Sequence, residues 1–273
     1  MRLLGFGFQK RRLVSIVYFI QLILAATVGL QTFQVINASI GDSVSIRGLQ
    51  IGNAHMVIND LLNVHGSSLS PLMGQVRWMI ICYLIIAVFV HAGVWTSLIH
   101  REKQHAFWVG GATYFFRCLV ISVLHLMIFV LWSGILWMPY LGRIQYWMEY
   151  LPSETPILWI GLAVFTVWMI GVIFLFVSST SSKIFLIRDE KSVWLSIKKA
   201  FVVSARKVLA FFPFFLLVAG VLFLFYMLHV WIDELPIMSS SIGILLLFLV
   251  QQIIVWSKIA IRISTYQFLL EKV

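Results

Sequence analysis

The chain has 273 residues, of which 61% are hydrophobic and only 11% are charged, and its formal net charge is +10 at pH 7. So few charged side chains cannot cover the surface of a water-soluble globule of this size. The composition therefore excludes an ordinary soluble domain and indicates a membrane protein. The positive charge does not indicate a nucleic-acid partner, because no zinc-ligand spacing, RNA-binding signature or continuous basic helix accompanies it.

Six apolar runs are long enough to cross the ~30 Å hydrocarbon core as helices, which takes about 20 residues each. None of the six contains Asp, Glu, Lys or Arg. They predict an all-α fold, a polytopic membrane helix bundle that forms a single integral membrane domain over residues 1–273. In chain order the predicted spans are 13–36, 78–99, 118–138, 157–179, 208–231 and 235–257.

The segment 37–77 between the first two spans is much longer than a tight turn. Its stretch "DSVSIRGLQIG" alternates like a short strand, and "NAHMVINDLLNVHG" has the apolar spacing of an amphipathic helix. The sequence leaves open whether that helix lies on the outer leaflet or plugs the bundle.

The segment "HAFWVGGATYFFRC" from His105 to Cys118 precedes the third span and combines aromatic residues, a Gly110-Gly111 pair and Arg117. This pattern is typical of an aromatic belt at the membrane interface, with an Arg whose head group reaches the water. The alternative is a lipid-headgroup or partner site that includes Arg117.

The stretch "IRDEKSVWLSIKKAFVVSARK" between the fourth and fifth spans predicts a cytoplasmic amphipathic helix over about 189–206, since its apolar residues recur at three- and four-residue steps. Asp189 and Glu190 favour a helix start there, because acids stabilise the positive end of the helix dipole. We expect this helix to lie on the inner leaflet, although packing on the fifth and sixth spans fits the sequence equally. The expected contacts with lipid or a partner are Trp194, Lys198, Lys199, Phe201, Arg206 and Lys207.

The basic residues give the expected orientation. Of the 20 Lys and Arg residues, only Arg47, Arg77 and Arg143 fall on the side opposite the basic loops. Short basic loops stay in the cytoplasm, so both termini and the loops after the second and fourth spans are expected inside. The expected partners are the lipid bilayer, anionic lipids at the cytoplasmic face, and a membrane protein.

Several polar residues lie within the predicted spans, and the candidate site residues among them are His91, His125, Gln251 and Gln252. Such groups either hydrogen-bond between helices or mark a transport pathway, and we favour the structural role. His91 and His125 face each other if the second and third spans pack antiparallel. No acid lies in the spans to complete a proton relay with a His, which argues against a proton-coupled transporter.

No catalytic motif of the G-x-S-x-G, H-E-x-x-H or P-loop type occurs in the sequence. The cysteines Cys82 and Cys118 have no C-x-x-C spacing and have the character of apolar core residues. The sequence therefore predicts no catalytic residue, no metal ligand and no cofactor, and we expect no enzyme activity.

The order of these features, from the basic start through "HMVINDLLNVHGSSLSPL" and "FWVGGATYFFR" to "KIFLIRDEKSVWLSIKKAF", resembles a diffuse group of uncharacterised bacterial six-span inner-membrane proteins. The resemblance covers nearly the whole chain. Similar proteins have an Asp followed three residues later by Arg after the fourth span, whereas Thr180 and Lys183 occupy those places here, so a shared polar pair is not expected. The resemblance implies the fold and an inner-membrane location, and it implies no activity.

From the sequence we therefore expect a multi-pass inner-membrane protein that acts as a non-catalytic accessory or scaffold and engages lipid or a partner complex. The alternative is a transporter or permease subunit that moves a small or lipid-like solute between the helices of the bundle.

Overall fold

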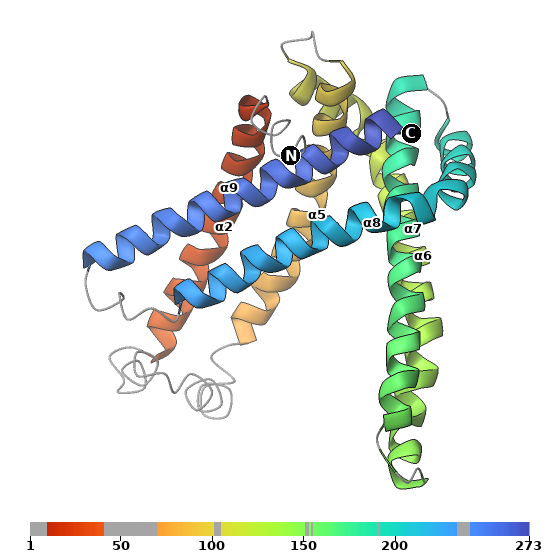
Figure 1. The fold of residues 1–273 in the computed structure, drawn as a ribbon. Coiled ribbons are helices and arrows are strands. Elements are labelled where there is room, and N and C mark those ends of the chain that lie inside the picture. The colour runs from red at the N-terminus through yellow and green to blue at the C-terminus, as the bar shows by residue number, and fades with distance from the viewer. Residues whose placement is uncertain are drawn as a thin grey trace. The chain divides into compact units, whose positions relative to one another are not determined.

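The structure is a computed structural model that describes residues 10–40, 70–100, 105–150, 153, 155–189, 192–233 and 241–272. These residues are almost entirely helical and include no β-strand, which confirms the predicted all-α fold. The expected strand and outer amphipathic helix between the first two spans fall on residues 42–66, outside the described residues. In chain order the helices are α2 (Arg11–Ile40), α5 (Ser70–Ile99), α6 (Ala106–Tyr150), α7 (Thr155–Asp189), α8 (Val193–Asp233) and α9 (Ser241–Lys272) (Figure 1).

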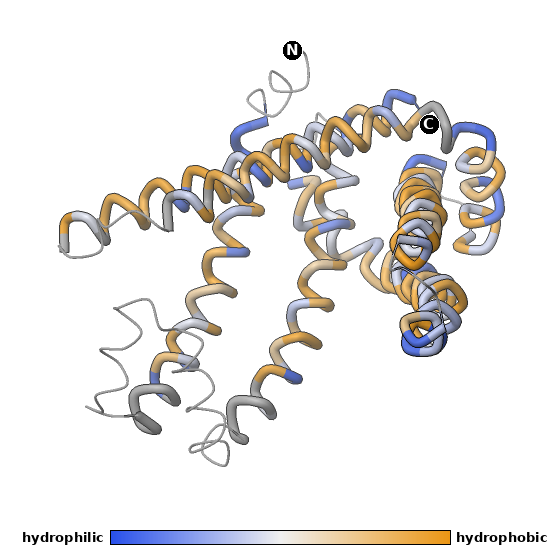
Figure 2. The backbone as a smooth tube through the Cα atoms, turned by 60° about the horizontal axis from the view of Figure 1, so that its bottom comes forward, coloured by the Kyte–Doolittle hydropathy of each residue, from blue (hydrophilic) through white to orange (hydrophobic). Residues whose placement is uncertain are grey.

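Each of these six helices is long and apolar enough to cross a membrane, and each contains one of the six predicted spans in whole or in large part. Hydrophobic residues prevail along the helices, whereas hydrophilic residues gather around the turn between α7 and α8 (Figure 2). Because about 20 residues suffice to cross the hydrocarbon core, the 45-residue α6 extends beyond the predicted third span at both ends. The fold fits a multi-pass membrane protein.

The contacts divide the chain into two compact units, residues 1–15 together with 88–273, and residues 16–87. The smaller unit contains most of α2 and the first part of α5, both with exposed apolar side chains such as Phe33 and Trp78. The larger unit contains His91, His125 and Lys183. The single membrane domain stays a prediction.

The buried side chains of the larger unit concentrate at the basic ends of its helices. Nearly every residue of α7 from Val177 to Ile187 is buried, as are most residues of α9 from Ile259 to Leu269. Both segments lie mainly beyond the predicted fourth and sixth spans and contain several Ser and Thr residues. Small polar residues allow helix backbones to approach closely. These two segments are therefore helical and packed against other helices, although they lie outside the predicted spans.

Helices α6 and α7 run side by side, α8 and α9 form a second neighbouring pair, and α7 contacts both α8 and α9 (Figure 1). Aromatic side chains of α6 lie over glycines of α7. The indole nitrogen of Trp132 lies 2.2 Å from the position of a Cβ atom built on Gly171, and the hydroxyl of Tyr140 lies 2.6 Å from one built on Gly161. These glycines let the bulky rings fit between the two helices.

Close backbone approach also joins the last part of α5 to the first turns of α6. A Cβ atom on Gly93 would meet the carbonyl oxygen of Phe107 at 2.6 Å, and one on Gly110 would meet Thr96 at 2.2 Å. The glycine pair before the predicted third span thus belongs to a helix crossing. Phe116 of the same segment is 74% exposed, as expected for an aromatic belt.

Candidate functional site

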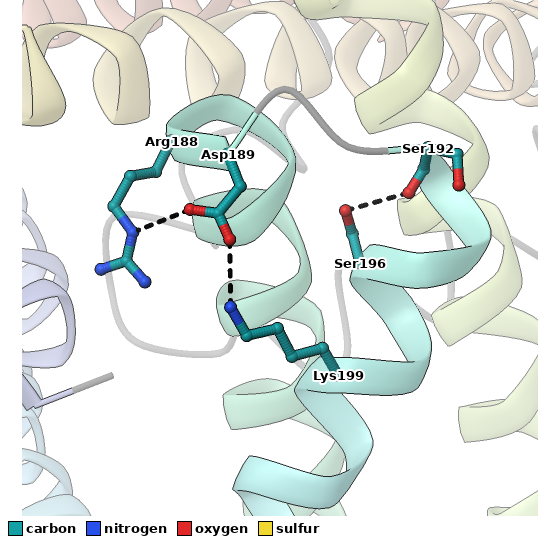
Figure 3. Close-up of polar contacts among 5 residues, drawn as sticks. All are labelled: Arg188, Asp189, Ser192, Ser196 and Lys199. Atoms are coloured by element: carbon teal, nitrogen blue, oxygen red, sulfur yellow. Dashed lines mark hydrogen bonds and ion pairs between the residues drawn. The ribbon is translucent and has the colours of Figure 1, made fainter.

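The turn between α7 and α8 carries the charged residues that the sequence singled out. Asp189 ends α7 and forms ion pairs with Arg188 at 3.3 Å and with Lys199 of α8 at 3.0 Å (Figure 3). The ammonium group of Lys199 also lies 4.2 Å from the centre of the Phe185 ring, a cation–π distance. Asp189 therefore forms an ion pair between the end of α7 and the first turns of α8.

The expected start of the amphipathic helix at Asp189 is wrong, because α7 continues to Asp189 and α8 begins at Val193. The residue before α8 is Ser192, whose hydroxyl accepts a hydrogen bond from the backbone N–H of Leu195 at 3.4 Å. This is the N-cap arrangement, in which a side-chain oxygen satisfies a free N–H of the first turn. A serine, and not the acids before it, thus marks the start of the helix.

The amphipathic segment is the first part of α8 and not a separate helix, since α8 runs without interruption to Asp233. Figure 1 shows that α8 changes direction between its first turns and its long apolar part, which contains Pro213. Pro213 lacks the N–H for one backbone hydrogen bond of this apolar part.

The first turns of α8 have two distinct faces. Ser196, Ala200 and Ser204, each four residues apart, are fully buried, so small side chains form the face in contact with the rest of the unit. On the other face Trp194 is 72% exposed and Leu195 is 56% exposed. An apolar surface of this kind is costly in water and is typical of contact with lipid or another protein.

The predicted lipid or partner contacts separate into two groups. Lys198, Arg206 and Arg117 are exposed, as are Trp194 and the ion-paired Lys199. In contrast, the half-buried Phe201 packs against the rings of His125 and Phe174, and Lys207 donates a hydrogen bond to the backbone carbonyl of Lys272. Phe201 and Lys207 thus contact the protein itself.

His125 on α6 is buried and forms a hydrogen bond between helices. Its Nδ1 lies 2.8 Å from the carbonyl oxygen of Ile121, one turn earlier, and its Nε2 lies 3.2 Å from the hydroxyl oxygen of Ser178 on α7. Because the backbone carbonyl can only accept, Nδ1 carries the proton and the neutral Nε2 accepts from Ser178. His125 thereby joins α6 to α7.

His91 on α5 bonds to α9 instead. Its Nε2 lies 3.1 Å from the hydroxyl of Tyr266 and 3.2 Å from a terminal nitrogen of Arg262, whose Nε also donates to Tyr266 at 2.9 Å. Both histidines thus make the predicted hydrogen bonds between helices, but they bind different partners and do not bond to each other. The reason is that Tyr266 and Arg262 of α9 reach His91 of α5, and residues so far apart in the sequence could not be paired from the sequence alone.

Lys183 of α7 is the most deeply buried charged residue among those described, with 7% of its surface exposed. It lies within electrostatic range of Arg262 on α9 and of His91 and His125. In the described part of the chain its ammonium group takes part in no ion pair and no hydrogen bond. Buried charges are normally paired, which makes this residue exceptional.

Gln251 and Gln252 are half-buried on α9. Within the described ranges no group of three or more His, Cys, Asp or Glu residues could hold a metal ion.

Sequence reasoning did not identify Lys183, Ser178, Arg262 or Tyr266 as site residues. Lys183, Arg262 and Tyr266 lie beyond the predicted spans, whereas Ser178 lies within the predicted fourth span.

No family model matches the chain, and no curated protein or solved structure is detectably similar to it. The resemblance to bacterial six-span inner-membrane proteins therefore stays a prediction.

Proposed function

We propose that the protein is a non-catalytic accessory or scaffold protein of a bacterial inner membrane, with both termini in the cytoplasm, and that the first turns of α8 engage the anionic inner leaflet. The exposed face of these turns, composed of Trp194, Leu195, Lys198, Val202 and Arg206, supports this proposal. It combines large apolar side chains with basic ones and begins directly after a helix of membrane-spanning length. A membrane protein partner on the same face is the competing occupant.

Lipid suits this face because both of its components gain free energy at an anionic bilayer. Burial of a large apolar side chain such as Trp194 contributes ~1.5 to 3 kcal/mol at most. Each Lys or Arg near the surface contributes ~1 kcal/mol, which salt weakens. Apolar burial should therefore dominate the interaction, and Lys198 and Arg206 should tune it.

The test places a nitroxide label on Trp194→Cys, in a full-length variant whose own two cysteines are replaced, reconstituted in vesicles that contain phosphatidylglycerol. Accessibility to oxygen, which concentrates in lipid, is compared with accessibility to a polar nickel chelate. Labels on Leu131→Cys, an exposed apolar position within the third span, and on Lys272→Cys provide the lipid and water references.

The proposal expects the label at position 194 to resemble the one at position 131, with high oxygen and low nickel accessibility. A label as accessible to the nickel chelate as the one at position 272 would contradict it. Oxygen and nickel accessibility that are both low would contradict lipid contact and show that protein, such as a second copy of the chain, covers the face.

The alternative, a transporter or permease subunit for a small or lipid-like solute, is supported by the buried polar side chains His125 and Lys183 and the half-buried His91 on helices of membrane-spanning length. It predicts that His125→Gln leaves folding and abundance intact and abolishes a cellular function. The accessory function predicts instead that any loss of function follows a loss of abundance.

A further inference from the structure

One ring nitrogen of His91 on α5 meets two side chains of α9. The Nε2 atom lies 3.1 Å from the hydroxyl of Tyr266 and 3.2 Å from a terminal nitrogen of Arg262. The Nε of Arg262 donates to the same hydroxyl at 2.9 Å, so this hydroxyl accepts from the guanidinium and donates its own proton to His91. All three residues belong to the larger unit. They join the last part of α5 to the last part of α9.

The ring nitrogen in this contact has to be unprotonated. A guanidinium nitrogen can only donate, so Nε2 meets Arg262 through its lone pair, and the ring proton lies on Nδ1. A proton on Nε2 would occupy that lone pair and direct one N–H group against another. This requirement holds whatever else Arg262 binds, because a guanidinium accepts no hydrogen bond. The contact between α5 and α9 therefore needs a neutral His91.

The charged groups that act on His91 oppose its protonation as long as the contact is made. They are Arg262 of α9 and Lys183 of α7, both positive. Helix α6 meets this part of α5 through Phe107 and Gly110, neither of which is titratable. In contrast, an imidazole released into water takes up a proton at about pH 6.5. The ring is half-buried and not sealed from the surroundings, so a change of pH can reach it.

We propose that His91 is a pH-sensitive latch between α5 and α9, which is closed while the ring is neutral and is released when the ring is protonated. The latch covers other side chains of α5. The ring of Trp95, one turn after His91, lies 4.8 Å from the ring of Tyr266, and Trp95 is 1% exposed. Leu98, two turns after His91 on the same helix face, is also 1% exposed. Release of the latch uncovers this face and frees the last turns of α9 from α5.

The direction and size of the pH effect follow from proton linkage. Only the released ring binds the additional proton, so the latch is fully closed above about pH 6.5 and is weakened as the pH falls below that value. Each further pH unit favours the released state by another factor of about ten. Between pH 7.5 and pH 5.0 the ratio of released to latched molecules therefore rises about thirtyfold.

The test measures how often residue 98 is uncovered at each pH. Full-length protein in detergent carries Leu98→Cys after replacement of its two native cysteines, and a second preparation carries Glu271→Cys, at an exposed position near the end of α9. The ratio of their rates of reaction with a maleimide gives the uncovered fraction at residue 98, because the effect of pH on the reagent and the thiols cancels. The ratio is also measured with His91→Gln, whose amide oxygen accepts from Arg262 at every pH. The matched control is His105→Gln, on an exposed histidine.

We expect the ratio to rise about thirtyfold from pH 7.5 to pH 5.0 in the Leu98→Cys protein and in its His105→Gln variant, and to change less than about threefold with His91→Gln. A ratio that does not change with pH while His91 is present, or an equal rise with His91→Gln, would overturn the proposal. Should His91→Gln fail to fold, Arg262→Gln takes its place, because its amide oxygen can accept from a protonated imidazole and should abolish the rise. The lipid contact of α8 enters none of these outcomes, so the two proposals can fail separately.

Discussion

Thr96 on α5 lies directly against Gly110 on α6, so close that a Cβ atom on residue 110 would come within 2.2 Å of both the Cβ and the Oγ1 atoms of Thr96. Such a distance is impossible for two heavy atoms that are not bonded. The crossing of α5 and α6 therefore depends on the absence of a side chain at position 110. Neither hydropathy nor helix propensity would have revealed this requirement.

Gly110→Ala should destabilise the protein by about 1 to 3 kcal/mol, the usual cost of overpacking, although alanine forms helix better than glycine by ~1 kcal/mol. Thermal unfolding in detergent measures the change. Gly134→Ala on the same helix is the control, because nothing lies within 4 Å of its added Cβ, and it should be neutral or slightly stabilising. Thr96→Gly should restore stability to Gly110→Ala. Equal effects of the two alanine substitutions would refute the close crossing.

The hydrogen bond between His125 and Ser178 should be energetically coupled across α6 and α7. In a double-mutant cycle with Ser178→Ala and His125→Leu, we expect a coupling free energy of about 0.5 to 2 kcal/mol, the range for hydrogen bonds between membrane helices. Ser182→Ala is a matched control, because the hydroxyl of Ser182 donates to the carbonyl of Ser178 on its own helix. A coupling with His125 no larger for Ser178→Ala than for Ser182→Ala would argue against the bond.

Ser192 should determine the start of α8. Ser192→Ala should lower the free energy of unfolding by about 0.5 to 2 kcal/mol through loss of the N-cap, whereas Ser192→Asp should keep most of it. Hydrogen exchange of the backbone N–H groups in the first turn of α8 provides a local measurement. If alanine and aspartate at this position gave the same exchange, Ser192 would not be the cap.

The ion pair between Asp189 and Lys199 should matter little for stability, since exposed pairs typically contribute about 0.2 to 1 kcal/mol. We therefore expect Asp189→Asn to have a small effect that disappears at high salt. A loss of several kcal/mol that persists in high salt would show instead that Asp189 is a central structural contact.

The spans could be predicted from the sequence because a helix that crosses the hydrocarbon core needs a continuous apolar run. Residues 78–99 and 157–179 are such runs and contain no charged residue. The continuation of α7 to Asp189 and of α9 to Lys272 could not be predicted in this way. There Ser, Thr, Lys and Gln are buried against other helices, and hydropathy assigns such residues to water. Their burial is decided by tertiary packing.

The candidate site was predictable only in part, for the same reason. His91 and His125 were recognisable as polar groups inside apolar runs, but their partners Tyr266 and Ser178 are distant in sequence. Lys183 was counted among the basic loop residues, because a sequence alone does not show that a lysine beside a span is buried.

In the proposed topology the basic helix ends face the cytoplasm, with α8 against the inner leaflet. Its most direct test is labelling of Lys198→Cys with a membrane-impermeant maleimide, in a variant lacking the two native cysteines, with Arg143→Cys as the opposite control. We predict that spheroplasts label position 143 alone and that inverted membrane vesicles label position 198 alone. Labelling of position 198 in spheroplasts would place α8 outside and contradict the account.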